Sequence, residues 1–292
     1  MHRAGGRCTA TPAITKQIPV TADLTACICT TCGTQFAESA APPADCPICL
    51  DQRQYVGDGG QSWTTLGELA ATHRIRVEDA EPGLVGIGVE PSFAIGQRAL
   101  LGGGLLWDCL SLVGAVGAVE AAGGIHTIAI SHPHYYGAMV EWADRFDARI
   151  LLHEADREHV MRPSDRIELW SGDRWPIDDE RELIRLGGHF AGGTICHWRN
   201  GAGGRGALLT GDIVQVVADR DWVSFMYSYP NLIPLPAGEV ERMRGVLETL
   251  EFDRIYGAWW GRNVMYDAKA KAVRSADRYL AALAGELPSG PP

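Results

Sequence analysis

The sequence lacks clusters of basic residues and apolar segments long enough to cross a bilayer. Its 26 lysines and arginines are outnumbered by 36 aspartates and glutamates, so the formal net charge is -10. No basic run supplies the electrostatic footprint that a phosphate backbone needs, and we expect no nucleic-acid partner. The apolar run Cys109–Val119 is short and rich in glycine, and it is bounded by Asp108 and Glu120. We therefore predict no membrane-spanning segment and no membrane partner.

The N-terminus also lacks an apolar stretch behind its early basic residues, so it does not have the pattern of a secretory signal. We expect a cytoplasmic protein, in which cysteines favour metal binding over disulfides. Residues 1–23 are small and polar without hydrophobic periodicity, which predicts a flexible tail. The remaining chain is long enough for a small appendage and one large α/β domain, since 46% of all residues are hydrophobic.

Four of the eight cysteines form two tight pairs with thirteen residues between them: Cys29-x-x-Cys32 and Cys46-x-x-Cys49. Two such pairs can close a tetrahedron of thiolates around one zinc ion. Cys27 lies beside the first pair and could replace Cys29. A closed site has no open position for water, so we predict a structural zinc ribbon over residues 24–60. The ion would supply folding free energy that so short a segment cannot obtain from a core.

The predicted large domain, residues 61–292, begins with short strands in a meander and continues with strands that alternate with helices. This order predicts two sheets covered by helices. The expected strands are 84–90, 93–101, 105–109, 126–131, 149–153, 183–188, 193–198, 206–212 and 253–260. The expected helices are 110–124, 139–146, 239–250 and 273–283, and 222–236 reads as a loop.

Histidines and an aspartate recur in short polar turns after apolar strands. His132 and His134, in SHPHYYG, are two residues apart at a strand end, so both imidazoles can reach one metal ion. His189 stands in GGHFAGGT and Asp212 in LLTGD. Glycines in these turns let the backbone approach a ligand closely.

The ordered set HxH, GHxxGGT and TGD resembles the metallo-β-lactamase superfamily over about residues 80 to 285. That resemblance implies an αββα sandwich with a metal on His132, His134, His189 and Asp212. Asp108, in LLWDC, matches the acidic residue that follows an early strand of that fold. More narrowly, the chain looks like an uncharacterised bacterial group that couples a CxxC ribbon to this domain and carries SHPHYY and YGAWWGR.

Three positions depart from the superfamily pattern HxHxDH. Tyr136 stands where the pattern has Asp, Gly137 replaces the next His, and the segment 256–262 contains no late histidine. All three lost groups belong to the second metal site of the superfamily. We therefore expect one zinc or iron ion in the large domain, in addition to the ribbon zinc.

The leading functional hypothesis is hydrolysis of an ester, thioester, lactone or amide of a small molecule by metal-bound hydroxide. Asp212 is the candidate base, and Tyr135 or Tyr136 could donate a hydrogen bond to an oxyanion, although both tyrosines could simply pack over the metal loop. A substrate wall could be formed by aromatic and polar residues of two late segments, which could equally cap a sheet edge. These residues are Met226, Tyr227, Tyr229, Asn231, Trp259, Trp260 and Arg262.

Two other hypotheses use the same residues. Two histidines and one carboxylate would form the facial triad of a mononuclear iron oxidoreductase, as in the persulfide dioxygenases of the superfamily. Alternatively, the protein binds a partner through a degenerate site and uses the ribbon as an interaction module. The sequence sets neither the substrate nor the oligomeric state.

Overall fold

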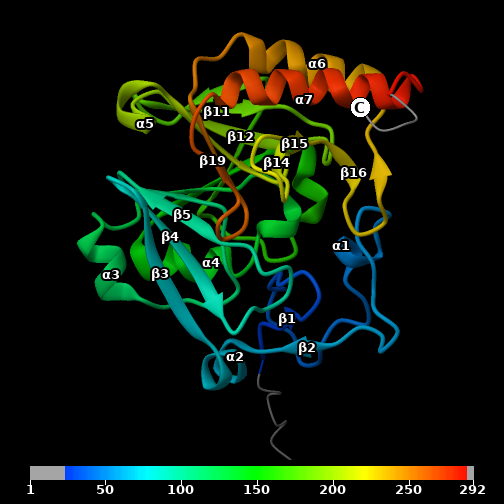
Figure 1. Ribbon diagram of the computed structural model, residues 1–292. Coiled ribbons are helices and arrows are strands. Elements are labelled where there is room, and N and C mark those ends of the chain that lie inside the picture. Colours follow the sequence, from blue (N-terminus) through cyan, green and yellow to red (C-terminus); the bar gives the residue numbers. More distant parts are fainter. Residues whose placement is uncertain (1–23, 288–292) are drawn as a thin grey trace, which may run out of the picture.

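The computed structural model describes residues 24–287, in which two β-sheets pack face to face and helices cover their outer faces (Figure 1). The predicted flexible tail, residues 1–23, lies outside the described residues. Helices α6 and α7 lie side by side over one sheet, and α3 and α4 lie on the opposite side of the molecule (Figure 1). The αββα sandwich expected from the sequence is confirmed.

The first sheet has seven strands in the order β3-β4-β5-β6-β7-β8-β9. It is antiparallel from β3 to β6 and parallel from β6 to β9. The strands are β3 Arg74–Glu81, β4 Leu84–Glu90, β5 Ala99–Gly102, β6 Leu105–Trp107, β7 Thr127–Ala129, β8 Arg149–His153 and β9 Ile167–Trp170.

The second sheet has six strands in the order β10-β11-β12-β13-β18-β19. All its pairs are antiparallel except β13 with β18. The strands are β10 Arg174–Pro176, β11 Arg181–Arg185, β12 Thr194–Trp198, β13 Ala207–Gly211, β18 Arg254–Gly257 and β19 Asn263–Val264.

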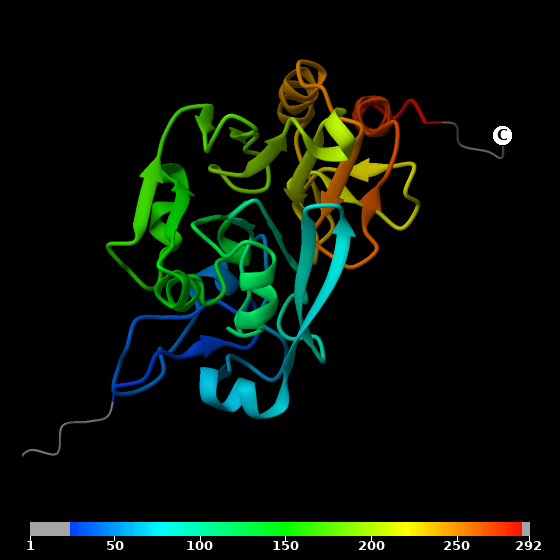
Figure 2. The same cartoon turned by 90° about the vertical axis from the view of Figure 1, so that its left-hand side faces the viewer.

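Short strand pairs and helices complete the described chain (Figure 2). The small pairs are β1 Ile28–Cys29 with β2 Trp63–Thr64, β14 Gln215–Val216 with β15 Val223–Ser224, and β16 Met226–Ser228 with β17 Ile233–Pro234. The helices are α1 Pro47–Leu50, α2 Leu66–Thr72, α3 Val116–Ala121, η1 Pro133–Tyr135, α4 Met139–Phe146, η2 Glu154–His159, α5 Gly201–Gly204, α6 Ala237–Glu248 and α7 Ala268–Leu283.

Alternation along the strands divides the apolar side chains among three layers. Leu105 and Trp107 of β6 point into the layer between the sheets, whereas Leu106 points toward the layer that contains α4. In the second sheet, Leu209 faces the first sheet and Leu208 faces α6 and α7. Because successive side chains on a strand point to opposite faces, each central strand contributes to two cores.

Several expected elements are shorter than the sequence pattern predicts. The strand expected at 93–101 begins only at Ala99, because the chain turns after Pro91 and Ala94 takes a left-handed conformation. The helix expected at 110–124 is confined to α3, which starts after the left-handed residue Ala115. The segment predicted as a loop, 222–236, contains the short strands β15, β16 and β17.

The ribbon is joined to the large domain by a sheet rather than by a free linker. Its strand β1 pairs with β2, so that Cys29 lies opposite Trp63, beyond the predicted end of the ribbon at residue 60. The Trp63 ring also packs edge-on against Phe36 at 4.9 Å between centroids. Within residues 24–287, no helix is both long and apolar enough to cross a membrane.

Candidate metal centres

The four cysteines of the two CxxC pairs converge on one point. Their sulfur atoms all lie within 4.8 Å of one another, and all four side chains are buried. Cys29 Sγ is 3.6 Å from Cys49 Sγ, and Cys32 Sγ is 3.7 Å from Cys46 Sγ. The Gln61 amide donates a hydrogen bond to Cys29 Sγ, and contacts with the other thiols lower the pKa of Cys29. Four sulfur atoms in this arrangement suit a metal ion held without an open position.

Cys27 is not part of this cluster. Its thiol lies 3.9 Å from the backbone oxygen of Thr25. The first CxxC pair contributes Cys29 and Cys32 to the cluster. The alternative in which Cys27 replaces Cys29 is therefore not the arrangement in the structure.

Three histidines from different parts of the chain form the second cluster. His132 and His134 flank the start of η1 after β7, and His189 lies in the turn between β11 and β12. One ring nitrogen of each lies within 4.8 Å of the others, and His189 Nε2 is 3.2 Å from His134 Nδ1. All three side chains are at most 3% exposed. Within residues 24–287, the cysteines and these histidines are the groups of three or more metal-ligating side chains that converge in this way.

Hydrogen bonds on the far side of two imidazoles set their tautomers. Ser131 Oγ donates its proton to Asp108 Oδ1 at 2.7 Å, so it must accept the proton of His132 Nδ1, 2.9 Å away. His189 Nδ1 lies 2.7 Å from the Tyr227 carbonyl, which can only accept. The Nε2 atoms of His132 and His189 are therefore unprotonated, and their lone pairs face the cluster. This is how histidine ligands are oriented around metals.

Burial keeps these imidazoles neutral. Desolvation, together with the positive charge that neighbouring histidines would carry, holds the pKa of His132 and His134 well below the usual range. Desolvation also lowers the pKa of His189 to about 4, and Arg53 contributes to this shift. Neutral imidazoles are the form that binds metal ions.

Asp212 adjoins the histidine cluster at the end of β13. Its Oδ1 lies 3.2 Å from His132 Nε2, and neither atom has a hydrogen-bond partner among the described residues. A lone pair on nitrogen and a carboxylate oxygen at this distance repel each other unless a proton or a cation lies between them. Buried polar atoms that lack a partner are costly, and a bound metal ion would satisfy both. The residues present therefore fit a metal ion.

Tyr135 and Tyr136 occupy different surroundings. The Tyr135 ring lies 4.4 Å from that of His132, and its buried hydroxyl has no hydrogen-bond partner within the described chain. Burial and the neighbouring Asp212 charge hold the pKa of Tyr135 well above its usual range. For Tyr136 the charge that acts is that of Asp156, in η2, rather than Asp212. Of the two tyrosines predicted as catalytic, Tyr135 is the one beside Asp212.

The backbone excludes a side chain at Gly137. A Cβ atom there would lie 2.7 Å from the backbone carbon and oxygen of Leu110, and Gly137 has a φ of +49°. The histidine that the superfamily pattern has at this position cannot fit. Just after β18, where no late histidine exists, Ala258 is buried in the same apolar cluster as Tyr135 and Tyr136.

The predicted substrate-wall residues divide into two groups. Tyr227 and Tyr229 adjoin the histidines: the Tyr227 carbonyl faces His189, and the Tyr229 hydroxyl donates to the Asp212 backbone oxygen at 2.6 Å. Asn231 instead donates its side-chain amide to two backbone oxygens of the ribbon, those of Gln52 and Gln54.

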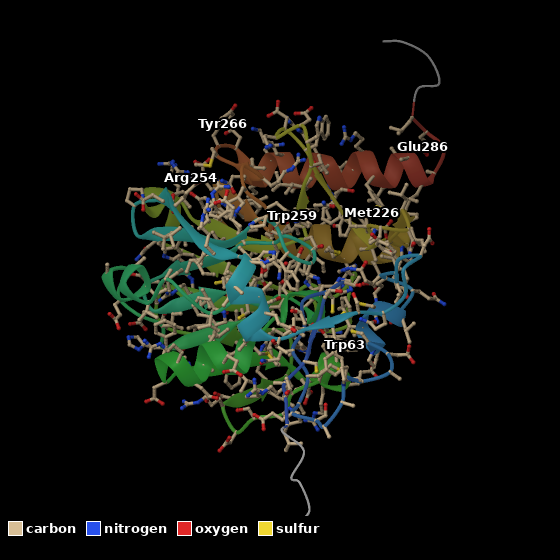
Figure 3. All side chains as sticks on the ribbon, turned by 90° about the horizontal axis from the view of Figure 1, so that it is seen from below. Trp63, Met226, Arg254, Trp259, Tyr266 and Glu286 are labelled. Carbon is tan, nitrogen blue, oxygen red and sulfur yellow. The ribbon has the colours of Figure 1, made fainter. Side chains whose placement is uncertain are left out.

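The other group comes from the segment after β18. Trp260 lies over Gly86 and Gly88 of β4 and is covered by the Arg76 guanidinium at 4.4 Å from its ring centre. Arg262 accepts a hydrogen bond from Gly257 through its backbone oxygen. Trp259, labelled in Figure 3, donates its ring nitrogen to the Ile95 oxygen and lies 6.5 Å from the Tyr135 ring. The role of these residues in substrate binding stays a prediction.

Sequence reasoning missed Arg53, which reaches the histidine cluster from the ribbon. Its guanidinium lies 3.8 Å above the Phe190 ring, and its Nη1 donates to the His189 backbone oxygen at 3.3 Å. The one local sign of a special role is the spacing Asp51-x-Arg53 directly after the second CxxC pair. That spacing gives no information about which ring the arginine covers.

Comparisons with known proteins agree with this architecture. The chain is 47% identical over 268 residues to the uncharacterized protein YmaE of Bacillus subtilis (strain 168), covering 89% of this chain and 97% of YmaE. The chain belongs to the YmaE family. No protein-family model matches it.

Among solved structures, this YmaE-family chain resembles the DIM-1 metallo-β-lactamase with a TM-score of 0.52 and 11% identity, over 73% of this chain and 99% of that one. VMB-1 gives a TM-score of 0.52 with 12% identity over the same shares. At such low identity these likenesses establish the metallo-β-lactamase fold alone. The YmaE-family chain therefore combines that fold with a four-cysteine cluster and a buried histidine triad.

Proposed function

We propose that this YmaE-family protein is a metal-dependent hydrolase that acts on an ester, thioester, lactone or amide of a small molecule. The observation that carries the proposal is the convergence of three buried, neutral imidazoles, with an unpartnered Asp212 carboxylate oxygen 3.2 Å from His132 Nε2. His132, His134 and His189 would hold one ion, with Asp212 as the fourth ligand or as a base beside it. The acidic net charge of -10 favours a small-molecule substrate over a nucleic acid.

A bound divalent ion would supply Lewis acidity toward a carbonyl oxygen and would lower the pKa of a water molecule toward neutrality. Asp212 can act as the general base, and later as the general acid, in such a reaction. Burial raises its pKa to about 7 in the absence of a cation, and a nearby positive charge favours the carboxylate form. A carboxylate beside the bound ion can accept a proton from water and later return it to a leaving group.

Tyr135 supplies the complementary group. Its raised pKa keeps the phenol protonated at neutral pH, and its hydroxyl lies toward the carboxylate of Asp212. A buried, protonated hydroxyl beside the ligands can donate a hydrogen bond to the oxyanion that forms when a carbonyl is attacked. Trp259 and His132, which pack against the Tyr135 ring, hold the phenol in place.

A single ion in the histidine cluster is the stoichiometry we propose. Gly137 leaves no space for a second-site histidine, and the Asp212 charge does not contribute to the pKa shift of Tyr136, which comes from burial and then from Asp156. A stable zinc site needs three or four protein ligands, so Asp212 alone cannot hold a second ion. Two ions per chain are then expected in total, one on each cluster.

The test is elemental analysis of protein purified without added metal, followed by hydrolysis assays on a panel of small esters, thioesters, lactones and amides. We expect two ions per chain, loss of hydrolysis after chelation, and recovery after zinc is restored. Hydrolysis that survives complete removal of metal from the histidine cluster would refute the proposal. Iron in that cluster, with oxygen consumption on a persulfide and no hydrolysis, would favour the oxidoreductase hypothesis instead.

A further inference from the structure

The second cysteine pair of the ribbon determines where Arg53 lies. Helix α1 follows Cys46 and contains Cys49, and Asp51 is the first residue after its end. Asp51 holds the Arg53 guanidinium with two hydrogen bonds, Nε to Oδ1 at 2.6 Å and Nη2 to Oδ2 at 2.7 Å. The Arg53 side chain is 15% exposed, so it is packed and not a free surface group. A paired, planar guanidinium of this kind keeps one orientation.

Arg53 in turn covers the turn that carries His189. Its guanidinium stacks on Phe190 at 3.8 Å and donates to the His189 backbone oxygen. The Phe190 ring packs against the rings of all three histidines, with centroid separations of 5.3 Å to His132, 4.8 Å to His134 and 5.1 Å to His189. A displacement of Arg53 would therefore be transmitted to every imidazole of the cluster.

A second path returns from the histidine cluster to the ribbon. The Tyr227 carbonyl that fixes the His189 tautomer belongs to β16, and the next residue, Ser228, donates its hydroxyl to the Arg53 backbone oxygen at 3.1 Å. The side chain of Asn231 bonds Gln52 and Gln54 on either side of Arg53. Figure 1 shows β16 directly above α1. His189 is thus held from both sides by groups attached to residues 51–54.

We propose that Arg53 is a positioning residue for His189 and that metal binding at the cysteine cluster strengthens metal binding at the histidine cluster. The proposal rests on the proposed function only in assuming that the histidines bind a metal ion. Without a metal on its cysteines the ribbon loses the fold that places Asp51 and Arg53. His189 then loses the contacts that aim its Nε2 at the other two imidazoles. Coupling of this kind is reciprocal, so an ion on the histidines must also favour retention of the ion on the cysteines.

Cobalt(II) binding to the full chain tests the proposal, because thiolate-bound cobalt absorbs in the near ultraviolet through charge transfer and imidazole-bound cobalt does not. Competition with a chelator then gives a separate affinity for each cluster. In Arg53→Ala we expect the cysteine cluster to stay loaded and the cobalt affinity of the histidine cluster to fall about tenfold or more. Arg53→Lys should recover only part of the affinity, because an ammonium cannot both stack on Phe190 and form two bonds to Asp51.

Arg76→Ala is the matched control. Like Arg53, Arg76 lies over an aromatic ring, that of Trp260 at 4.4 Å, and pairs with an acidic residue two positions away, Glu78. None of the described interactions of Arg76 involves the turn that carries His189. Its removal should change the cobalt affinity of the histidine cluster less than about twofold. A larger effect in Arg53→Ala would then be due to the contacts of Arg53 with the His189 turn, and not to the general loss of an arginine stacked on a ring.

The outcomes separate the two proposals. Unchanged cobalt affinity at the histidine cluster in Arg53→Ala, with the cysteine cluster loaded, overturns the coupling. If Arg53→Ala instead empties the cysteine cluster, Asp51→Asn decides: it must weaken the histidine cluster severalfold with the cysteines loaded, and wild-type affinity there overturns the coupling. Cobalt that binds the histidines in an Arg53-dependent manner, without hydrolysis of any substrate, leaves the coupling intact and removes the proposed function. If the histidine cluster of the wild-type protein binds no cobalt, both the coupling and the proposed function are refuted.

Discussion

The cysteine and histidine clusters are assembled in opposite ways. The four cysteines lie within one short segment, residues 29–49, and they contact one another with two sulfur pairs at 3.6 and 3.7 Å. The histidine cluster instead joins a turn after β7, a turn before β12 and, through Asp212, the end of β13. It draws on both sheets, and its buried atoms include several without hydrogen-bond partners within residues 24–287.

This contrast supports a structural role for the cysteine cluster and, as we propose, a catalytic role for the histidine cluster. A closed set of four thiolates leaves no position for a substrate, whereas three imidazoles beside an unpartnered carboxylate and phenol leave room for chemistry. The ribbon is nevertheless not independent of the histidine cluster, because Arg53 contacts the turn that carries His189.

Replacing both Cys46 and Cys49 by Ser should remove the ion on the cysteines, weaken metal binding by the histidines and cause the largest loss of stability. The ribbon core consists mainly of the cysteines with Phe36 and Ile48, so little apolar burial remains without the ion. We expect the free energy of unfolding to fall by about 4 kcal/mol or more, which denaturant titration would measure. A variant that keeps two ions per chain would show that the cysteines hold no metal.

His189→Ala should empty the histidine cluster and abolish hydrolysis, while the ion on the cysteines stays bound. The loss of a direct ligand should exceed the effect of an outer contact, so we expect metal affinity to fall more than about 100-fold. His153→Ala is the control, since His153 is also buried but bonds the Gly172 oxygen outside the cluster. Equal metal loss in both variants would argue against a specific role for His189.

Tyr135→Phe should slow turnover without loss of metal. The hydroxyl beside Asp212 is removed while the ring that packs on His132 stays, and loss of an oxyanion donor costs about 100-fold in kcat. Tyr136→Phe tests the other predicted tyrosine and should have a smaller effect, because Asp212 influences the pKa of Tyr135 but not that of Tyr136. Metal loss in either variant, measured by elemental analysis, would identify that tyrosine as a ligand.

Gly137→Ala should destabilise the protein by about 2 kcal/mol, because its Cβ would meet the Leu110 backbone at 2.7 Å in a left-handed conformation. Gly117→Ala is the matched control: Gly117 lies in α3 with open space around it, so alanine there should be neutral or slightly stabilising. Thermal unfolding of both variants compares them. Equal stability of the two would mean that position 137 tolerates a side chain, which would reopen the question of a second metal site.

Strong periodic segments predicted most of the fold. Leu84–Glu90, Arg149–His153 and α7 lie close to where alternation and helical spacing indicated, because their patterns reflect faces that are buried in the structure. The predictions were least accurate where the chain turns at residues that are not typical of turns. The region from Pro91 to Ala115 contains left-handed residues other than glycine, and these shorten both the strand and the helix expected there.

Local spacing by itself determined the cysteine cluster, because CxxC pairs fix their geometry within a few residues of chain. The motifs HxH, GHxxGGT and TGD also identified the residues that meet at the histidine cluster. Tertiary structure alone decided which tyrosine lies beside Asp212, why residue 137 has no side chain, and that Arg53 covers Phe190. These facts depend on contacts between residues far apart in sequence, such as the 136 positions between Arg53 and His189. No local pattern encodes such contacts, because they arise only when the ribbon packs against the folded sandwich.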